Sequence, residues 1–146
     1  MAQVILTNHF SLQELTFSEV AARKGLDNTP SPEIIEALRH TAQGLERIRG
    51  LVGKPIHVNS GYRSPKVNAA AGGQPNSQHM RGEAADIICK DVPPRELATL
   101  IAENRMDLAI DQVILEFGLW THVSFTDTPR HAILTIDNEG TRAGIA

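Results

Sequence analysis

The chain has 146 residues, of which 41% are apolar and 21% are charged, and its formal net charge is −3. This composition is typical of one ordinary globular domain with a single core. No basic run stands out, and phosphate binding needs clustered lysine and arginine, so the composition argues against nucleic acid as the main partner. Cys89 is the only cysteine, which excludes an intrachain disulfide.

The first third of the chain is predicted to be helical. Ser11 and Glu14 form a capping-box pattern, so a short helix should begin at Leu12. A further turn or two should end at Gly25. A long helix follows the sequence Ser31-Pro32-Glu33, which offers an N-cap, a first-turn proline and a first-turn acid. Its apolar residues recur at helical spacing until Gly50, where the helix is expected to end. They are Ile34, Ile35, Leu38, Ala42, Leu45 and Ile48.

The rest of the chain is expected to consist mainly of strands. A short strand over residues 56–59 precedes a polar stretch over residues 60–83, and long ordered loops of this kind are usually functional. Further strands are predicted at 84–89, 112–116, 120–125 and 132–136, and a helix at 91–104. Because helices come first and strands gather later, the predicted class is α+β. We expect a single domain over residues 1–146, with N-terminal helices packed on a mainly antiparallel sheet.

An aspartate interrupts the apolar strand Ala84-Ala85-Asp86-Ile87-Ile88-Cys89. A carboxylate in such a strand costs several kcal/mol unless a cation or hydrogen bonds compensate. Taken alone, a buried aspartate is more often a structural hydrogen-bonding residue. His79 lies seven residues earlier, and Gly82 between them permits a tight turn. One imidazole and one carboxylate at this separation are suitable zinc ligands.

A second histidine lies on the predicted strand Trp120-Thr121-His122-Val123-Ser124-Phe125. A hairpin register that pairs Glu116 with His122 also pairs Leu115 with Val123 and Val113 with Phe125. One face of this hairpin is then apolar, and the other carries an acid directly beside a histidine. A surface salt bridge is the simpler interpretation of this pair alone.

Together, His79, Asp86 and His122 form a coherent set of three ligands that leaves zinc a fourth position for water. Zinc would lower the pKa of that water towards ~7, and Glu116 could take its proton. Arg63 begins the polar stretch. Its guanidinium could bind a substrate carboxylate or polarise a scissile carbonyl, although a loop-stabilising salt bridge is also common for such an arginine.

Three motifs together resemble the zinc D-Ala-D-Ala carboxypeptidase family. They are Ser60-Gly61-Tyr62-Arg63-Ser64, then Ser77-Gln78-His79-Met80-Arg81-Gly82-Glu83-Ala84-Ala85-Asp86, and finally Trp120-Thr121-His122. That family shares its fold with the L-alanyl-D-glutamate endopeptidases of phage lysins and with the hedgehog signalling domain. The resemblance implies one Zn²⁺ per chain on His79, Asp86 and His122, and a substrate contact by Arg63.

The general base departs from the family pattern. Several branches of the family have an acid three residues before the last histidine ligand, and here that position is Leu119. A leucine cannot accept a proton. Glu116 is the nearest acid, and the hairpin argument places it on the correct face.

The resemblance implies a zinc-dependent peptidase that hydrolyses peptide bonds in peptidoglycan stem peptides, as a phage or prophage lysin or a virion-associated enzyme. Two alternatives stay open: a D-Ala-D-Ala carboxypeptidase and a non-catalytic zinc-bearing binding module. We expect a monomeric catalytic domain without a wall-binding module. The N-terminus lacks a signal-peptide pattern, and no apolar run reaches the ~18 residues of a membrane span. The protein is therefore expected to be made in the cytoplasm of a bacterium or an infected host and to reach the cell wall by release or delivery.

Overall fold

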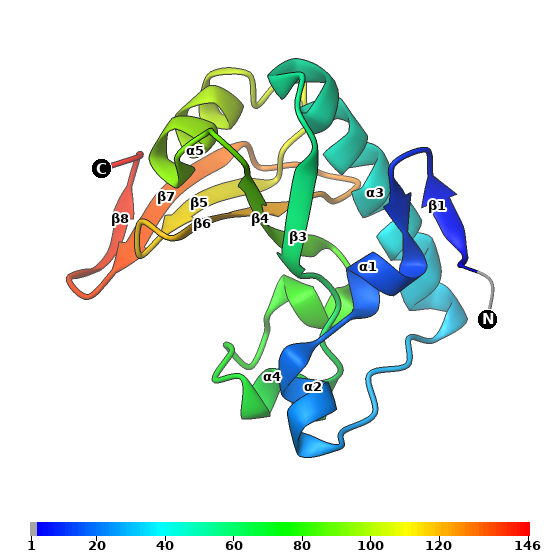
Figure 1. Ribbon diagram of the computed structural model, residues 1–146. Helices are drawn as coiled ribbons and strands as arrows, with labels where there is room; N and C mark the ends of the chain where they lie inside the picture. Colours follow the sequence, from blue (N-terminus) through cyan, green and yellow to red (C-terminus); the bar gives the residue numbers. More distant parts are fainter. Residues whose placement is uncertain (1–2) are drawn as a thin grey trace.

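The computed structural model describes residues 3–146 and confirms the α+β class (Figure 1). Its main sheet has the strand order β3-β4-β6-β5-β7-β8, and every neighbouring pair except β5 and β7 is antiparallel. The strands of this sheet are β3 (Ile56–Ser60), β4 (Ala84–Cys89), β5 (Gln112–Glu116), β6 (Trp120–Ser124), β7 (Ala132–Asp137) and β8 (Gly140–Ala143). A separate two-stranded sheet pairs β1 (Ile5–Thr7) with β2 (Phe10–Ser11).

The N-terminal helices follow their predicted capping signals. Helix α1 (Leu12–Thr16) begins with the capping box of Ser11 and Glu14, and α2 (Glu19–Lys24) ends at Gly25. Helix α3 (Pro32–Val52) begins after the N-cap Ser31 but continues through Gly50, where we expected it to end. It stops at Gly53, whose positive φ of 74° forms the left-handed cap.

The sheet buries one face against α3 and α5 (Pro94–Glu103), which form the main core with it. The apolar face predicted for the β5–β6 hairpin is confirmed, because Val113, Leu115 and Val123 are all buried in this core. Strand alternation sends their neighbours to the opposite face. Asp86 and His122 are therefore held by a rigid sheet but point away from its main core.

The long polar stretch between β3 and β4 is not a plain loop. It contains helix α4 (Pro65–Ala70) and the 3₁₀ helix η1 (Gln78–Arg81). Helix α4 begins after the N-cap Ser64 with a proline in its first turn, and it lies beside α2 below the end of β3 (Figure 1). This packing gives the segment that carries His79 a fixed position against the sheet.

The predicted register of the β5–β6 hairpin is wrong by two residues. Ile114 lies opposite His122, and Glu116 lies opposite Trp120. The turn is tighter than expected because Phe117 and Gly118 both adopt positive φ, which closes the hairpin with three residues instead of five. A shift of two preserves the faces, so Glu116 still lies on the same side of the sheet as His122.

None of the helices over residues 3–146 combines the length and the apolar character that crossing a membrane requires.

Candidate metal centre

Three buried side chains from two strands and one short helix converge on one point. His79 comes from η1, Asp86 from β4 and His122 from β6, where Asp86 and His122 are directly paired. Oδ1 of Asp86 lies 3.3 Å from Nε2 of His79 and 3.0 Å from Nδ1 of His122. One ligand atom from each residue lies within 4.8 Å of the others. The structure therefore brings together all three residues that the sequence suggested as metal ligands.

The hydrogen bonds of His79 fix its tautomer. Its Nδ1 lies 2.7 Å from the carbonyl oxygen of Gly61, which can only accept, so Nδ1 carries the proton. The lone pair of Nε2 is then free. Nε2 is buried and has no hydrogen-bond partner anywhere in residues 3–146. The nearby oxygen of Asp86, at 3.3 Å, can only accept, so it cannot donate to this lone pair. Burial also lowers the pKa of His79, which favours the neutral imidazole that metal binding needs.

The local backbone holds His79 in this orientation. Ser77 accepts a hydrogen bond from the backbone N–H of His79 and so begins η1, and Gly82 ends it with a φ of 73°. On the other side of the ring, Gly61 approaches the end of α1 so closely that a β-carbon would overlap the carbonyl oxygen of Leu15. Only glycine allows this approach, which places the carbonyl that His79 contacts.

Asp86 is ionised in this environment. Although burial opposes ionisation, the charge of His79 when it is protonated and the hydrogen bond with His122 outweigh it and hold the pKa of Asp86 below its usual range. The guanidinium of Arg63 adds positive charge at 3.8 Å from Oδ2, and it also donates to Asn68. A neutral imidazole with a free lone pair, a carboxylate and a second imidazole are a donor set that suits zinc.

Glu116 lies at the edge of this cluster. Its Oε1 is 3.7 Å from Nδ1 of His122, and its Oε2 accepts a hydrogen bond of 3.1 Å from the indole of Trp120. Burial and the charge of Asp86 raise the pKa of Glu116 above its ordinary value. A carboxylate that is easier to protonate, fixed by one hydrogen bond and beside the candidate ligands, is suited to proton transfer.

The cluster opens into a cavity of about 840 Å³. Its walls include all five residues that the sequence singled out: Arg63, His79, Asp86, Glu116 and His122. Side chains of β3, β4, β6, β5 and β7 form its floor, so the cavity crosses most of the sheet. A segment of an extended peptide could lie across it, with the cluster within reach.

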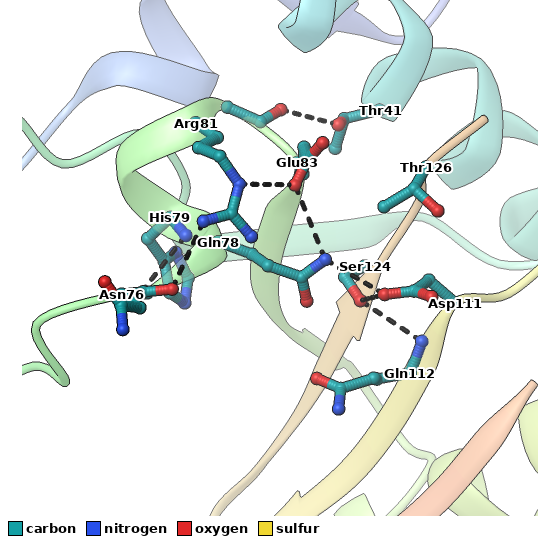
Figure 2. A network of polar contacts seen from close by, with 12 residues as sticks. Thr41, Asn76, Gln78, His79, Arg81, Glu83, Asp111, Gln112, Ser124 and Thr126 are labelled. Carbon is teal, nitrogen blue, oxygen red and sulfur yellow. Dashed lines mark hydrogen bonds and ion pairs between the residues drawn. The ribbon is translucent and has the colours of Figure 1, made fainter. Parts of the chain in front are cut away.

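A second buried carboxylate near the cluster, that of Asp111, was not recognised from the sequence. Asp111 accepts hydrogen bonds from Gln78 and from Ser124 (Figure 2). It also accepts hydrogen bonds from three nitrogens of Arg130. Gln78 directly precedes His79, so this network ties the η1 turn to the beginning of β5. The sequence offered only one signal, an acid between the apolar residues Ile110 and Val113, and no partner could be assigned to it.

Comparison with known proteins agrees with this geometry. The family model described as Peptidase M15 matches residues 8–124. The chain is also 50% identical over 44 residues to a zinc D-Ala-D-Ala carboxypeptidase from Streptomyces albus G. That stretch is 30% of this chain but only 17% of the length of the Streptomyces protein. Because the family model covers well over half of the sequence and includes every residue of the cluster, the chain belongs to the Peptidase M15 family.

Proposed function

We propose that the protein is a zinc-dependent peptidase that hydrolyses peptide bonds in peptidoglycan stem peptides. The observation that carries this proposal is the convergence of His79, Asp86 and His122, with the free Nε2 of His79, in a large cavity beside Glu116. Family membership supports peptide hydrolysis, and the name of the Streptomyces relative supports zinc and a wall peptide as substrate.

In this proposal His79, Asp86 and His122 hold the metal. A bound zinc would supply an activated water and polarise the scissile carbonyl. His79 binds through Nε2, because its Nδ1 proton is committed to Gly61. The same hydrogen bond orients the ring and increases its basicity.

Glu116 is the proposed general base. It takes a proton from the attacking water and gives it to the leaving amine, and its raised pKa suits both steps. Trp120 holds one carboxylate oxygen, which leaves the other free to face the water and the substrate.

Arg63 is the proposed substrate-binding residue. It lines the cavity, and its Nη2 lies near Asp86 at 3.8 Å without the short contacts of a committed ion pair. Its planar guanidinium can bind a substrate carboxylate through two parallel hydrogen bonds or polarise the carbonyl that is attacked.

The cleaved bond defines two versions of the proposal. We favour an endopeptidase of phage or prophage type, which acts on the wall after release or delivery as a monomeric domain. The name of the Streptomyces relative favours a carboxypeptidase that trims D-Ala-D-Ala termini. The alternative to both is a non-catalytic zinc-bearing module. An acid beside the candidate ligands, Glu116, favours an enzyme over such a module.

The test is a digest of purified sacculi, synthetic stem peptides and unfolded casein, with products identified by mass. We expect new amino groups from sacculi, lost with a chelator and restored by zinc. The mass of the products identifies the cleaved bond. Cleavage of casein without cleavage of sacculi would overturn the wall substrate but keep the peptidase. A zinc-loaded protein that cleaves none of the three would overturn the enzymatic proposal.

A further inference from the structure

The turn of the β5–β6 hairpin has an unusual residue at its first central position. The backbone N–H of Leu119 donates to the carbonyl of Glu116, and the two residues between them, Phe117 and Gly118, have φ of 55° and 66°. Positive φ at both central positions is the pattern of a type I′ turn, which strongly prefers Asn-Gly. Glycine fits this pattern, whereas a bulky aromatic residue is rarely found in the left-handed region.

The side chain of Phe117 is also exposed. It is 46% exposed, and its ring lies 6.0 Å from that of Trp120. Its backbone N–H donates to the carbonyl of Ile136 on β7, which fixes the turn against the sheet. The disfavoured backbone opposes folding, and the ring buries only about half of its surface in the free protein. An asparagine at this position would fit the turn better, so the phenylalanine serves something other than folding.

Phe117 lines the same cavity as the candidate metal cluster. The strand order places β6, with Trp120 and His122, next to β5, with Glu116, and then β7, with Ile136. Phe117, Trp120 and Ile136 therefore form an apolar wall at the β7 side of the cavity. The part of the cavity wall that is formed by the segment between β3 and β4 is instead polar. It includes Gln74, Asn76, Ser77 and Arg81.

We propose that Phe117, supported by Trp120 and Ile136, is a specificity-determining residue that packs against an uncharged, C–H-rich part of the substrate. This inference rests on the proposed function. Two parts of a wall fragment have this chemistry: the alanine methyl groups of the stem peptide and the apolar face of a sugar ring. An apolar cavity wall with a few polar groups opposite is the usual composition of a site that orients its ligand.

The decisive variant is Phe117→Asn, because it restores the preferred Asn-Gly turn and removes the ring. We expect a melting temperature that does not fall, unchanged zinc content, and a KM for wall fragments raised about tenfold, the scale of a lost apolar contact. The value of kcat should change much less. Phe117→Tyr keeps a ring and should retain nearly the normal KM.

Leu119→Asn is the matched control. Leu119 belongs to the same turn and is 64% exposed, but it is not among the residues that line the cavity. The same loss of an exposed apolar side chain should leave KM unchanged. Assays on synthetic stem peptides and on sugar-bearing muropeptides separate the two substrate parts, since a loss on both identifies the peptide and a loss on muropeptides alone identifies the sugar.

An unchanged KM of Phe117→Asn on both substrates would overturn the inference, as would a lower melting temperature with normal kinetics of the folded fraction. Both outcomes require that the wild-type protein cleaves the fragments in the same assay. A wild-type protein that cleaves neither substrate would instead overturn the proposed function, so the two failures are distinguishable.

Discussion

Two buried aspartates lie close to the η1 turn, and their surroundings differ in one decisive respect. Asp111 is 1% exposed, and its Oδ2 accepts hydrogen bonds from Gln78 and Ser124 (Figure 2). Arg130 donates to both oxygens, so each of them has a donor. Asp86 is 7% exposed, and it faces two imidazoles, one of which presents a lone pair without a donor. Both oxygens of the first aspartate are satisfied by donors within the protein, whereas the second aspartate faces a buried ring nitrogen that has no hydrogen-bond partner in the described part of the chain.

This difference separates a structural carboxylate from a candidate metal ligand. Burial opposes ionisation of both aspartates, and in both the neighbouring groups outweigh it and lower the pKa. A lowered pKa therefore does not distinguish them. The unpartnered Nε2 of His79 does, because native proteins rarely leave a buried polar atom without a partner unless it has a function.

The largest expected effect is that of Asp86→Asn. The amide preserves the shape of the side chain but removes the negative charge, so zinc should be lost and peptide hydrolysis should fall to background. Metal analysis of protein purified without added metal measures the first effect, and the sacculus digest measures the second. Asp111→Asn is the control at the other aspartate, and it should keep its zinc. A variant of Asp86 that retains zinc in a one-to-one ratio would refute its role as a ligand.

The next effect in size is that of Glu116→Gln, which should separate metal binding from catalysis. Zinc content should be unchanged, because Glu116 is outside the ligand set. The rate should fall by ~100- to 10,000-fold, which is the usual contribution of a positioned general base. Steady-state kinetics on a synthetic stem peptide give the factor. Near-normal turnover would assign the proton transfer to another group.

The smallest effect is that of Asp111→Asn, which should act on stability. The amide keeps one acceptor oxygen but replaces the other with an NH₂ group and removes the charge. Gln78 and the half-exposed Arg130 therefore lose part of their common acceptor, at a cost of about 2 kcal/mol at pH 7. The pKa of Asp111 is lowered by folding, so its contribution is present above the unfolded value of ~3.9 and is lost as pH falls further. Urea denaturation at pH 7 and pH 3 should therefore show a larger difference between variant and wild type at pH 7 than at pH 3. An equal difference at both values would mean that the charge is irrelevant.

The sequence predicted the parts of the molecule that local patterns determine. Capping residues gave the helix starts, and strand alternation correctly separated the faces of the hairpin. The three candidate ligands were recognisable because a histidine and an aspartate flank a glycine turn, and a second histidine lies on a later strand. Their convergence is confirmed by the structure, and metal binding itself stays a prediction.

The errors arose where a local pattern allowed two interpretations, or where the partner of a residue lies far away in the sequence. The predicted hairpin register was wrong because Phe117 occupies a turn position at which asparagine is the usual residue, so the sequence did not indicate a tight turn there. Helix α3 continued beyond Gly50 because Gly53, and not Gly50, adopts the left-handed cap. The role of Asp111 depends on Gln78 and Arg130, which are 33 and 19 residues away, so no local pattern could identify it.

The close approach of Gly61 to Leu15 has a consequence for protein engineering. A designer who grafts the η1–β4 segment onto another sheet would carry over two of the three candidate ligands, but not the carbonyl that selects the tautomer of His79. That carbonyl belongs to Gly61, the residue directly after β3, and its placement requires a missing β-carbon against the end of α1. The minimal transferable unit is therefore discontinuous, and it must include a backbone contact with the N-terminal helix.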